Sequence, residues 1–177
     1  MKTHVWVLGV VVIGSFSSLC RADLRPERIH VAESRKTKAY IQEGLVTGGF
    51  GKVDNFIVKD IRWAKNGPFE RIVVDLGGYT QGEETELNRP PYFQVALSPE
   101  ENRMTLSLSG KAKLSFNSNK VIASFKKSKF VEQVTLLPLI EGVPWTCVFQ
   151  LKPEVMVETF ELGQPVRVIL DLQPKKK

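Results

Sequence analysis

Between residues 55 and 172 the chain alternates short apolar runs with turns. Each run is rich in β-branched and aromatic residues, and each turn carries Gly, Pro, Asn or acidic residues. This pattern is typical of β-hairpins. The paired runs are residues 55–65 with 71–78, 92–98 with 103–110, 113–116 with 120–127, 130–140 with 145–152, and 154–162 with 166–172.

The number and spacing of these runs predict an all-β fold. They give about ten short strands, mostly joined as antiparallel pairs, and no long helical period interrupts them. Strands at such spacing form sandwiches or barrels. We expect antiparallel hairpins packed as two small sheets, a β-sandwich, over residues 53–173.

The first 22 residues have the three parts of a secretory signal peptide. A short basic start is followed by the apolar run 5–16 and by a small-residue stretch that ends at Ala22. We expect cleavage after Ala22, which gives a periplasmic or secreted protein. The apolar run is shorter than the ~20 residues that span a bilayer, so no stable membrane span is expected after cleavage.

Two other interpretations of this segment stay open. An uncleaved signal would anchor the chain in the membrane. Cys20 follows the apolar run as it does in lipoproteins, although Leu19 is not the small residue that a lipidation signal places before its cysteine.

Residues 23–52 differ in composition from the rest of the chain. They are charged and mixed, and they end in a glycine-rich stretch, so we expect a flexible or partly helical lead segment. Residues 174–177 form a basic tail. Loss of residues 1–22 leaves 23 basic against 19 acidic residues, a mild net charge of +4, and no nucleic-acid partner is expected.

One element recurs along the chain. Residues 71–76 read RIVVDL and residues 167–172 read RVILDL, while residues 103–108, RMTLSL, are a weaker third copy. Because side chains alternate along a strand, Ile72, Val74 and Leu76 are predicted to face the core. Arg71 and Asp75 then share the opposite face.

The Arg and Asp of one copy lie roughly 13 Å apart at ~3.3 Å per residue, too far to pair within one strand. They can instead pair with charges on a neighbouring strand and fix the register. The alternative is that Arg71 and Arg167, with Asp75 and Asp171, bind a carboxylate or phosphate ligand.

The repeat resembles the AMIN domain, which occurs in bacterial cell-wall amidases and outer-membrane secretins. The opening match is Arg71, Ile72, Val73, Asp75 and Leu76. The closing match is Phe160, Leu162, Pro165, Arg167, Val168, Ile169, Asp171 and Leu172, with Gln164 where the family has asparagine. The resemblance implies two small β-sheets packed back to back, with peptidoglycan or envelope proteins as partners.

Catalytic chemistry has little support in the sequence. After cleavage the only histidine is His30, in the lead segment, so neither a Ser-His-Asp arrangement nor a zinc site is indicated. The glycines of residues 48–52 lack the P-loop ending. Cys147 alternates with Trp145 and Phe149 and is expected in the core. We expect no enzyme, no cofactor and no metal.

Binding is therefore the expected function. The polar loop that starts at Tyr79 and ends near Tyr92 is the best candidate for a recognition edge, and either tyrosine is a candidate ligand contact. The resemblance implies a non-catalytic envelope module that binds peptidoglycan or helps to localise an envelope machine. The alternatives are a protein-protein adaptor of a secretin or pilus assembly and, with least support, a cell-wall hydrolase.

Overall fold

The computed structural model describes residues 36–50 and 53–175. The predicted signal peptide 1–22, the lead segment up to residue 35 and the last two lysines of the tail lie outside the described residues.

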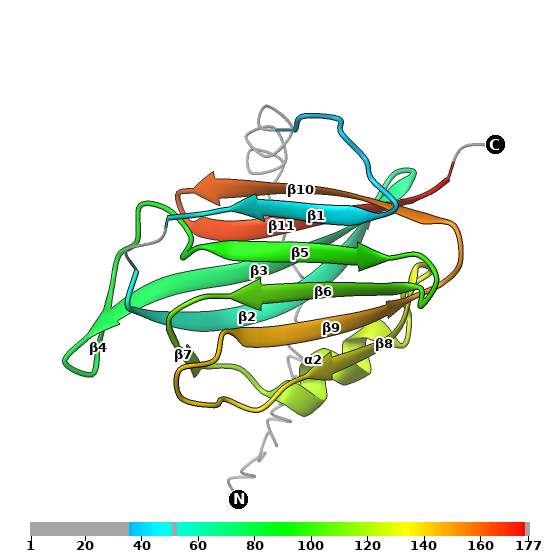
Figure 1. The fold of residues 1–177 in the computed structure, drawn as a ribbon. Helices are drawn as coiled ribbons and strands as arrows, with labels where there is room; N and C mark the ends of the chain where they lie inside the picture. Colours follow the sequence, from blue (N-terminus) through cyan, green and yellow to red (C-terminus); the bar gives the residue numbers. More distant parts are fainter. Residues whose placement is uncertain (1–35, 51–52, 176–177) are drawn as a thin grey trace, which may run out of the picture.

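The described chain is mostly β-structure, arranged as two sheets packed face to face (Figure 1). The five-stranded sheet has the order β1 (Gly44–Gly48), β5 (Phe93–Ser98), β6 (Arg103–Leu108), β9 (Trp145–Leu151) and β8 (Val131–Leu136). The six-stranded sheet has the order β10 (Val155–Gly163), β11 (Val166–Pro174), β3 (Phe69–Thr80), β2 (Asn55–Asn66) and β7 (Lys111–Leu114), and the short β4 (Glu83–Thr85) pairs with β3. The predicted two-sheet sandwich is confirmed.

Four of the five predicted hairpins are present. They are the antiparallel pairs β2–β3, β5–β6, β8–β9 and β10–β11. The strand β8 ends at Leu136, earlier than the predicted run to residue 140. Pro138 lacks a backbone N–H and cannot continue the ladder.

The fifth predicted hairpin, residues 113–116 with 120–127, is wrong. The strand β7 pairs in parallel with β2, and Ser118–Phe125 form the helix α2. The side chain of Asn117 accepts a hydrogen bond from the backbone N–H of Lys120 at 3.0 Å and so caps this helix. Val121 and Phe125, four residues apart, bury the same helical face.

A strand also lies inside the segment that was expected to be flexible or partly helical. The strand β1 pairs with β5 in antiparallel register, with Val46 opposite Val95. This segment shows no sustained apolar pattern because β1 is an edge strand with Leu45 exposed and Val46 only half-buried.

The core lies between the two sheets and follows the predicted alternation. Ile72, Val74 and Leu76 are each at most 3% exposed and belong to it, as do the alternate residues of β9, including Cys147. Trp63 is half-buried against the same core and donates its indole N–H to the Ser124 carbonyl at 3.0 Å. The row of core residues and the core position of Cys147 are confirmed.

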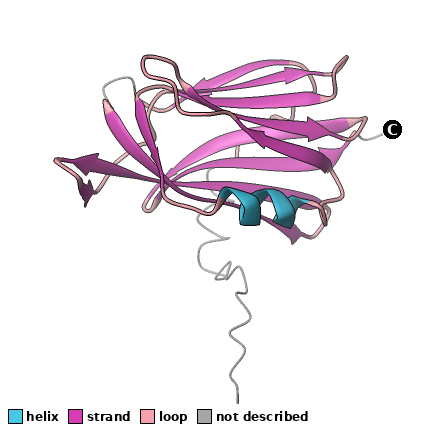
Figure 2. Cartoon of the chain, turned by 90° about the horizontal axis from the view of Figure 1, so that it is seen from below, coloured by secondary structure: helices cyan, strands magenta, loops and turns pink. Residues whose placement is uncertain are grey.

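Two polar contacts close the sides of the sandwich. On one side, β1 lies beside β10 (Figure 1), and Glu161 accepts a hydrogen bond from the backbone N–H of Gly49 at 2.7 Å. On the other side, α2 packs against β2 and β8 (Figure 2). There the buried Glu70 of β3 accepts from the Ser128 hydroxyl at 2.5 Å and from the Lys129 N–H at 2.9 Å.

Removal of a central core side chain should test this packing. Leu106 is fully buried on β6, between β5 and β9, so Leu106→Ala should lower the free energy of unfolding by roughly 2–5 kcal/mol. Urea unfolding measures this change. Leu45→Ala is the matched control, since Leu45 is 56% exposed, and an equal loss in both variants would contradict the assigned core.

Candidate functional site

The two best copies of the repeat lie side by side in the six-stranded sheet. The strand β3 carries Arg71 and Asp75, and β11 carries Arg167 and Asp171. In the antiparallel register Arg71 lies opposite Asp171, and Asp75 lies opposite Arg167. The motif is therefore complementary to itself, because equal spacing in both strands places each arginine opposite the other strand's aspartate.

The first of these ion pairs is buried and bidentate. Arg71 donates from Nε to Oδ1 of Asp171 at 2.7 Å and from Nη2 to Oδ2 at 2.8 Å. Arg71 is 2% exposed and Asp171 is fully buried. The second pair joins Nε of Arg167 to Oδ1 of Asp75 at 2.6 Å, and Arg62 donates to the same carboxylate. The predicted cross-strand pairing is confirmed.

The face that carries these charges is buried as well. Val73, Phe160, Leu162 and Ile169 form a second apolar cluster there, separate from the core between the sheets. The sequence suggested that this face of β3 and β11 points away from the core, and it does, but burial of its apolar residues was not foreseen. An apolar neighbourhood strengthens each ion pair and penalises any charge left without a partner.

Residues that precede β1 reach this buried face. Nζ of Lys36 lies 2.6 Å from Oδ2 of Asp171 and 3.8 Å from the centre of the Phe69 ring. The backbone N–H of Lys38 donates to the fully buried Glu158 at 2.7 Å. Burial raises the pKa of Tyr40 well above its ordinary value, and the carboxylates of Asp171 and Glu158 raise it further.

The third copy has a different environment. On β6, Ser107 replaces the aspartate, and its hydroxyl lies 3.0 Å from that of Thr146 on β9. Arg103 pairs with Glu101 in the neighbouring turn, and both side chains are about half exposed. This copy belongs to the other sheet and does not pair with a second Arg-Asp strand.

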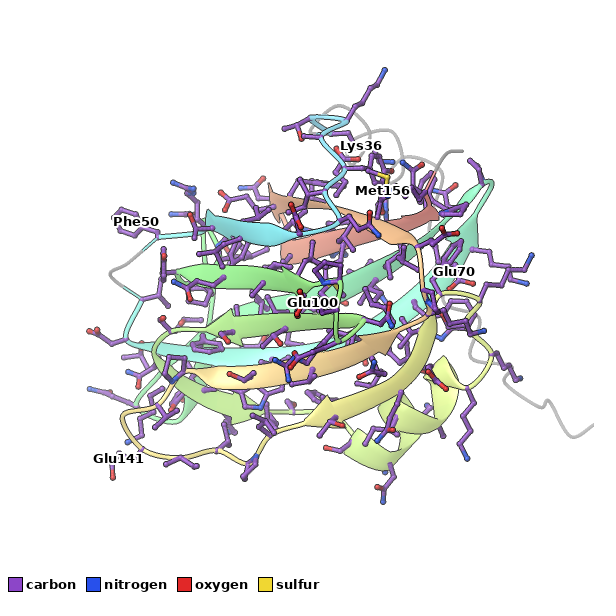
Figure 3. All side chains as sticks on the ribbon, turned by 45° about the vertical axis from the view of Figure 1, so that its right-hand side comes forward. Lys36, Phe50, Glu70, Glu100, Glu141 and Met156 are labelled. Carbon is purple, nitrogen blue, oxygen red and sulfur yellow. The ribbon has the colours of Figure 1, made fainter. Side chains whose placement is uncertain are left out.

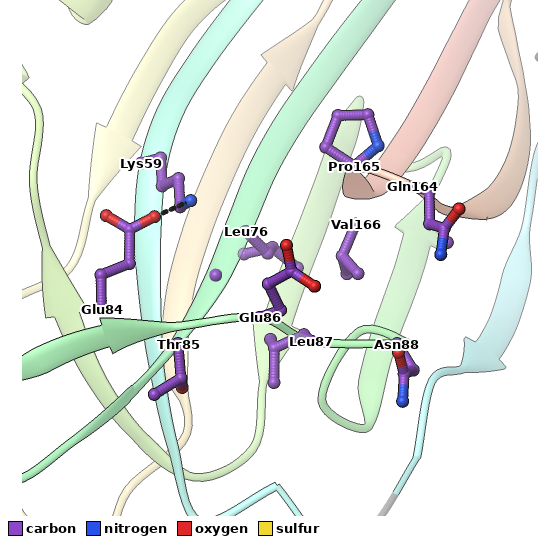
Figure 4. Close-up of a pocket in the computed structure, with 12 residues that line it drawn as sticks. Lys59, Leu76, Glu84, Thr85, Glu86, Leu87, Asn88, Gln164, Pro165 and Val166 are labelled. Carbon is purple, nitrogen blue, oxygen red and sulfur yellow. Dashed lines mark hydrogen bonds and ion pairs between the residues drawn. The ribbon is translucent and has the colours of Figure 1, made fainter.

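A pocket opens at the end of the six-stranded sheet (Figure 4). Its volume is about 650 Å³, and it lies between residues 84–88, which begin in β4, and the turn from β10 to β11. Its polar groups are the carboxylates of Glu84 and Glu86, the amides of Asn88 and Gln164, the amine of Lys59 and the hydroxyl of Thr85. Its apolar walls come from Leu76, Leu87, Pro165 and Val166.

The glycine pair in β3 makes this pocket possible. A Cβ atom at Gly77 would collide with the side chain of Lys59, and one at Gly78 would collide with Thr85 and Leu87. Lys59 can therefore lie across β3 and pair with Glu84. Figure 4 shows the Glu86 carboxylate between this ion pair and Gln164.

None of the predicted site residues lines the pocket. Arg71, Asp75, Arg167 and Asp171 are engaged within the sheet, and Tyr79 lies on β3 opposite Glu84. The hydroxyl of Tyr92 accepts a hydrogen bond from Gln94 at 3.1 Å. The predicted loop between the two tyrosines does line the pocket, through residues 84–88. The many polar residues of this loop indicated a binding site from the sequence alone. Lys59 and Gln164 are distant from the loop in sequence and lie beside it only in the folded chain.

Metal binding, membrane crossing and thiol chemistry can each be assessed over residues 36–50 and 53–175. No group of three or more His, Cys, Asp or Glu side chains there is arranged to hold a metal ion. No helix in the same ranges is long and apolar enough to cross a membrane. Burial raises the pKa of the Cys147 thiol far above its ordinary value, so this thiol stays protonated.

Comparison with family models, with curated proteins and with solved structures finds no match for this chain. The resemblance to the AMIN domain therefore stays a prediction.

Loss of the buried arginine should be costly. Arg71→Ala leaves the Asp171 carboxylate buried with fewer donors, and we expect a loss of roughly 3–5 kcal/mol in the free energy of unfolding. Arg103→Ala is the matched control, because Arg103 occupies the same place in the third copy but its ion pair is half exposed; it should cost less than about 1 kcal/mol.

Urea unfolding of both variants measures the difference. The double substitution Arg71→Met with Asp171→Leu should lose less stability than Arg71→Ala, since it removes both members of the buried pair and Lys36 keeps Glu158, 4.0 Å away, as a partner. Equal stability of Arg71→Ala and Arg103→Ala would refute the structural importance of the buried pair.

Tyr40 predicts a dependence of stability on alkaline pH. Its pKa is raised in the folded state, so above the ordinary value of 10.0 the unfolded chain loses a proton that the folded chain keeps. The free energy of unfolding should then fall as the pH rises above 10.0, and Tyr40→Phe should lack this contribution. Unfolding at about pH 8 and about pH 11 checks it; parallel losses in both proteins would contradict it.

Proposed function

We propose that this protein is a non-catalytic module of the cell envelope that binds peptidoglycan through the pocket between residues 84–88 and the turn 163–166. The observation that carries the proposal is the composition of this pocket. Two carboxylates, two amides and one amine stand beside apolar walls in about 650 Å³. Binding sites commonly combine such walls with a few fixed polar groups.

The pocket chemistry suits a stem peptide of the cell wall. Such peptides offer a free amine, several amides and alanine methyl groups. Glu86 is exposed, and among the described residues it has no ion-pair partner, so its carboxylate is open to a ligand amine. Asn88 and Gln164 can bond peptide amides, and Leu87 and Pro165 can contact methyl groups.

The burial of the repeat supports this location. Arg71 and Arg167 already donate to Asp171 and Asp75, so a ligand would have to break charge-assisted bonds to use them. The pocket residues lie instead on segments with exposed side chains, where function on a β scaffold is usually found. The exported location expected from residues 1–22 brings the protein to the cell wall.

Co-sedimentation with purified sacculi tests the proposal. The chain from Asp23 onward contains every helix and strand described, and it should sediment with sacculi at low salt. The double substitution Glu86→Ala with Gln164→Ala removes one charged and one amide contact, so binding should weaken by roughly tenfold or more.

The matched control is Glu132→Ala with Gln133→Ala, the same residue types, exposed on β8 of the other sheet. It should bind as the parent chain does. Equal binding of both double variants would locate recognition elsewhere. If the parent chain stayed in the supernatant, peptidoglycan binding would be excluded and the protein adaptor favoured.

A further inference from the structure

The loop from Leu137 to Pro144, which joins β8 to β9, exposes an unusual amount of apolar surface. Leu139 is 50% exposed, Ile140 60% and Val143 52%. A soluble domain commonly exposes single apolar residues, but a contiguous group marks a contact with a partner or a membrane. Figure 3 shows Glu141, at the centre of the loop, at the outer limit of the molecule, so this loop projects from the sandwich.

A groove of about 850 Å³ lies between this loop and the chain that leads into β7. Residues 139–145 form one wall and residues 109–112 the other. Trp145 is 2% exposed, and among the described residues its buried indole N–H has no acceptor. Trp145 belongs to the core between the sheets and forms the base of the groove.

Basic side chains follow the same edge of the molecule. Residues 111–129 contain six lysines and no acidic residue, and all six are exposed. These are Lys111, Lys113, Lys120, Lys126, Lys127 and Lys129. They lie on β7, on α2 and in the turn before β8, along the lower part of Figure 1. Lys111 lines the groove itself, whereas the turn before β8, with Lys129 beside Glu70, lies at the far end of β8 from the loop. Within the described part of the chain none of them forms an ion pair.

We propose that this edge is a surface that binds anionic lipid bilayers, with the loop 137–144 inserted at the boundary between headgroups and acyl chains. The lysines would hold lipid phosphates, each worth ~1 kcal/mol near an anionic surface. Apolar residues with flanking basic residues are the pattern of proteins that lie on a membrane.

The one-sided charge favours a bilayer over a protein partner. Residues 111–129 carry one sign of charge and lie on the same edge as the exposed apolar loop, and this combination is found in segments that lie on anionic membranes. Glu141 is the single acidic residue of the loop, and its charge opposes insertion near anionic lipid. This surface shares no residue with the pocket proposed for peptidoglycan, so either proposal can fail without the other.

Vesicle sedimentation tests the proposal with the chain from Asp23 onward. We expect binding to vesicles of phosphatidylglycerol and phosphatidylethanolamine, little binding to phosphatidylcholine, and a loss of binding as salt is added. Leu139→Ser with Ile140→Ser should weaken binding by roughly tenfold or more, since both side chains lose apolar burial. Lys111→Gln with Lys113→Gln should weaken it by about fivefold per lysine, and Glu141→Gln should strengthen it.

Leu45→Ser with Phe50→Ser is the matched control, because these side chains are 56% and 50% exposed outside this edge. It should bind vesicles as the parent chain does, and circular dichroism checks that each variant is folded. Equal binding by the loop variant and the control would overturn the proposal. Failure to bind any vesicle, with a loop-dependent change in mass by sedimentation velocity, would overturn it in favour of self-association.

Discussion

The pairing of β3 with β11 is the constraint on which the six-stranded sheet depends. Both strands carry arginine and aspartate four residues apart, so the antiparallel register that places Val73 opposite Ile169 also places each arginine opposite an aspartate. A shift of β11 by one residue would move its core row to the other face and turn its charged side chains into the apolar core between the sheets. The ion pairs thus select one register among the many that apolar strands permit.

This arrangement determines where recognition can occur. The charged side chains of the repeated element pair with one another and with Lys36 and Arg62, so few of its polar groups are left for a ligand. These side chains are Arg71, Asp75, Arg167 and Asp171. The available groups are on the short edge strand β4 and on segments outside the sheets, in residues 84–88, the turn 163–166 and the loop 137–144. The repeat builds the scaffold, and the irregular segments carry the candidate sites.

The sequence predicted those features that depend on local alternation, namely four hairpins and the core rows of β3 and β9. It failed where tertiary contacts decide. Val121, Ile122 and Phe125 favour a strand by composition, but the Asn117 cap and burial of Val121 and Phe125 stabilise a helix. The edge strand β1 lacks a strong alternation of apolar and polar residues. Lys59 reaches the pocket only because Gly77 leaves room for its side chain.

The two ends of the sandwich are unequal. The turns 67–68 and 99–102 join their strands with a few residues, whereas residues 81–92 and 137–144 make long excursions at the other end, on the left in Figure 1. Binding residues of a β scaffold are commonly found on its long loops. The polar pocket and the apolar loop both lie at that end, on different sheets. A module that used both would have one binding end and would contact the cell wall and the bilayer from it.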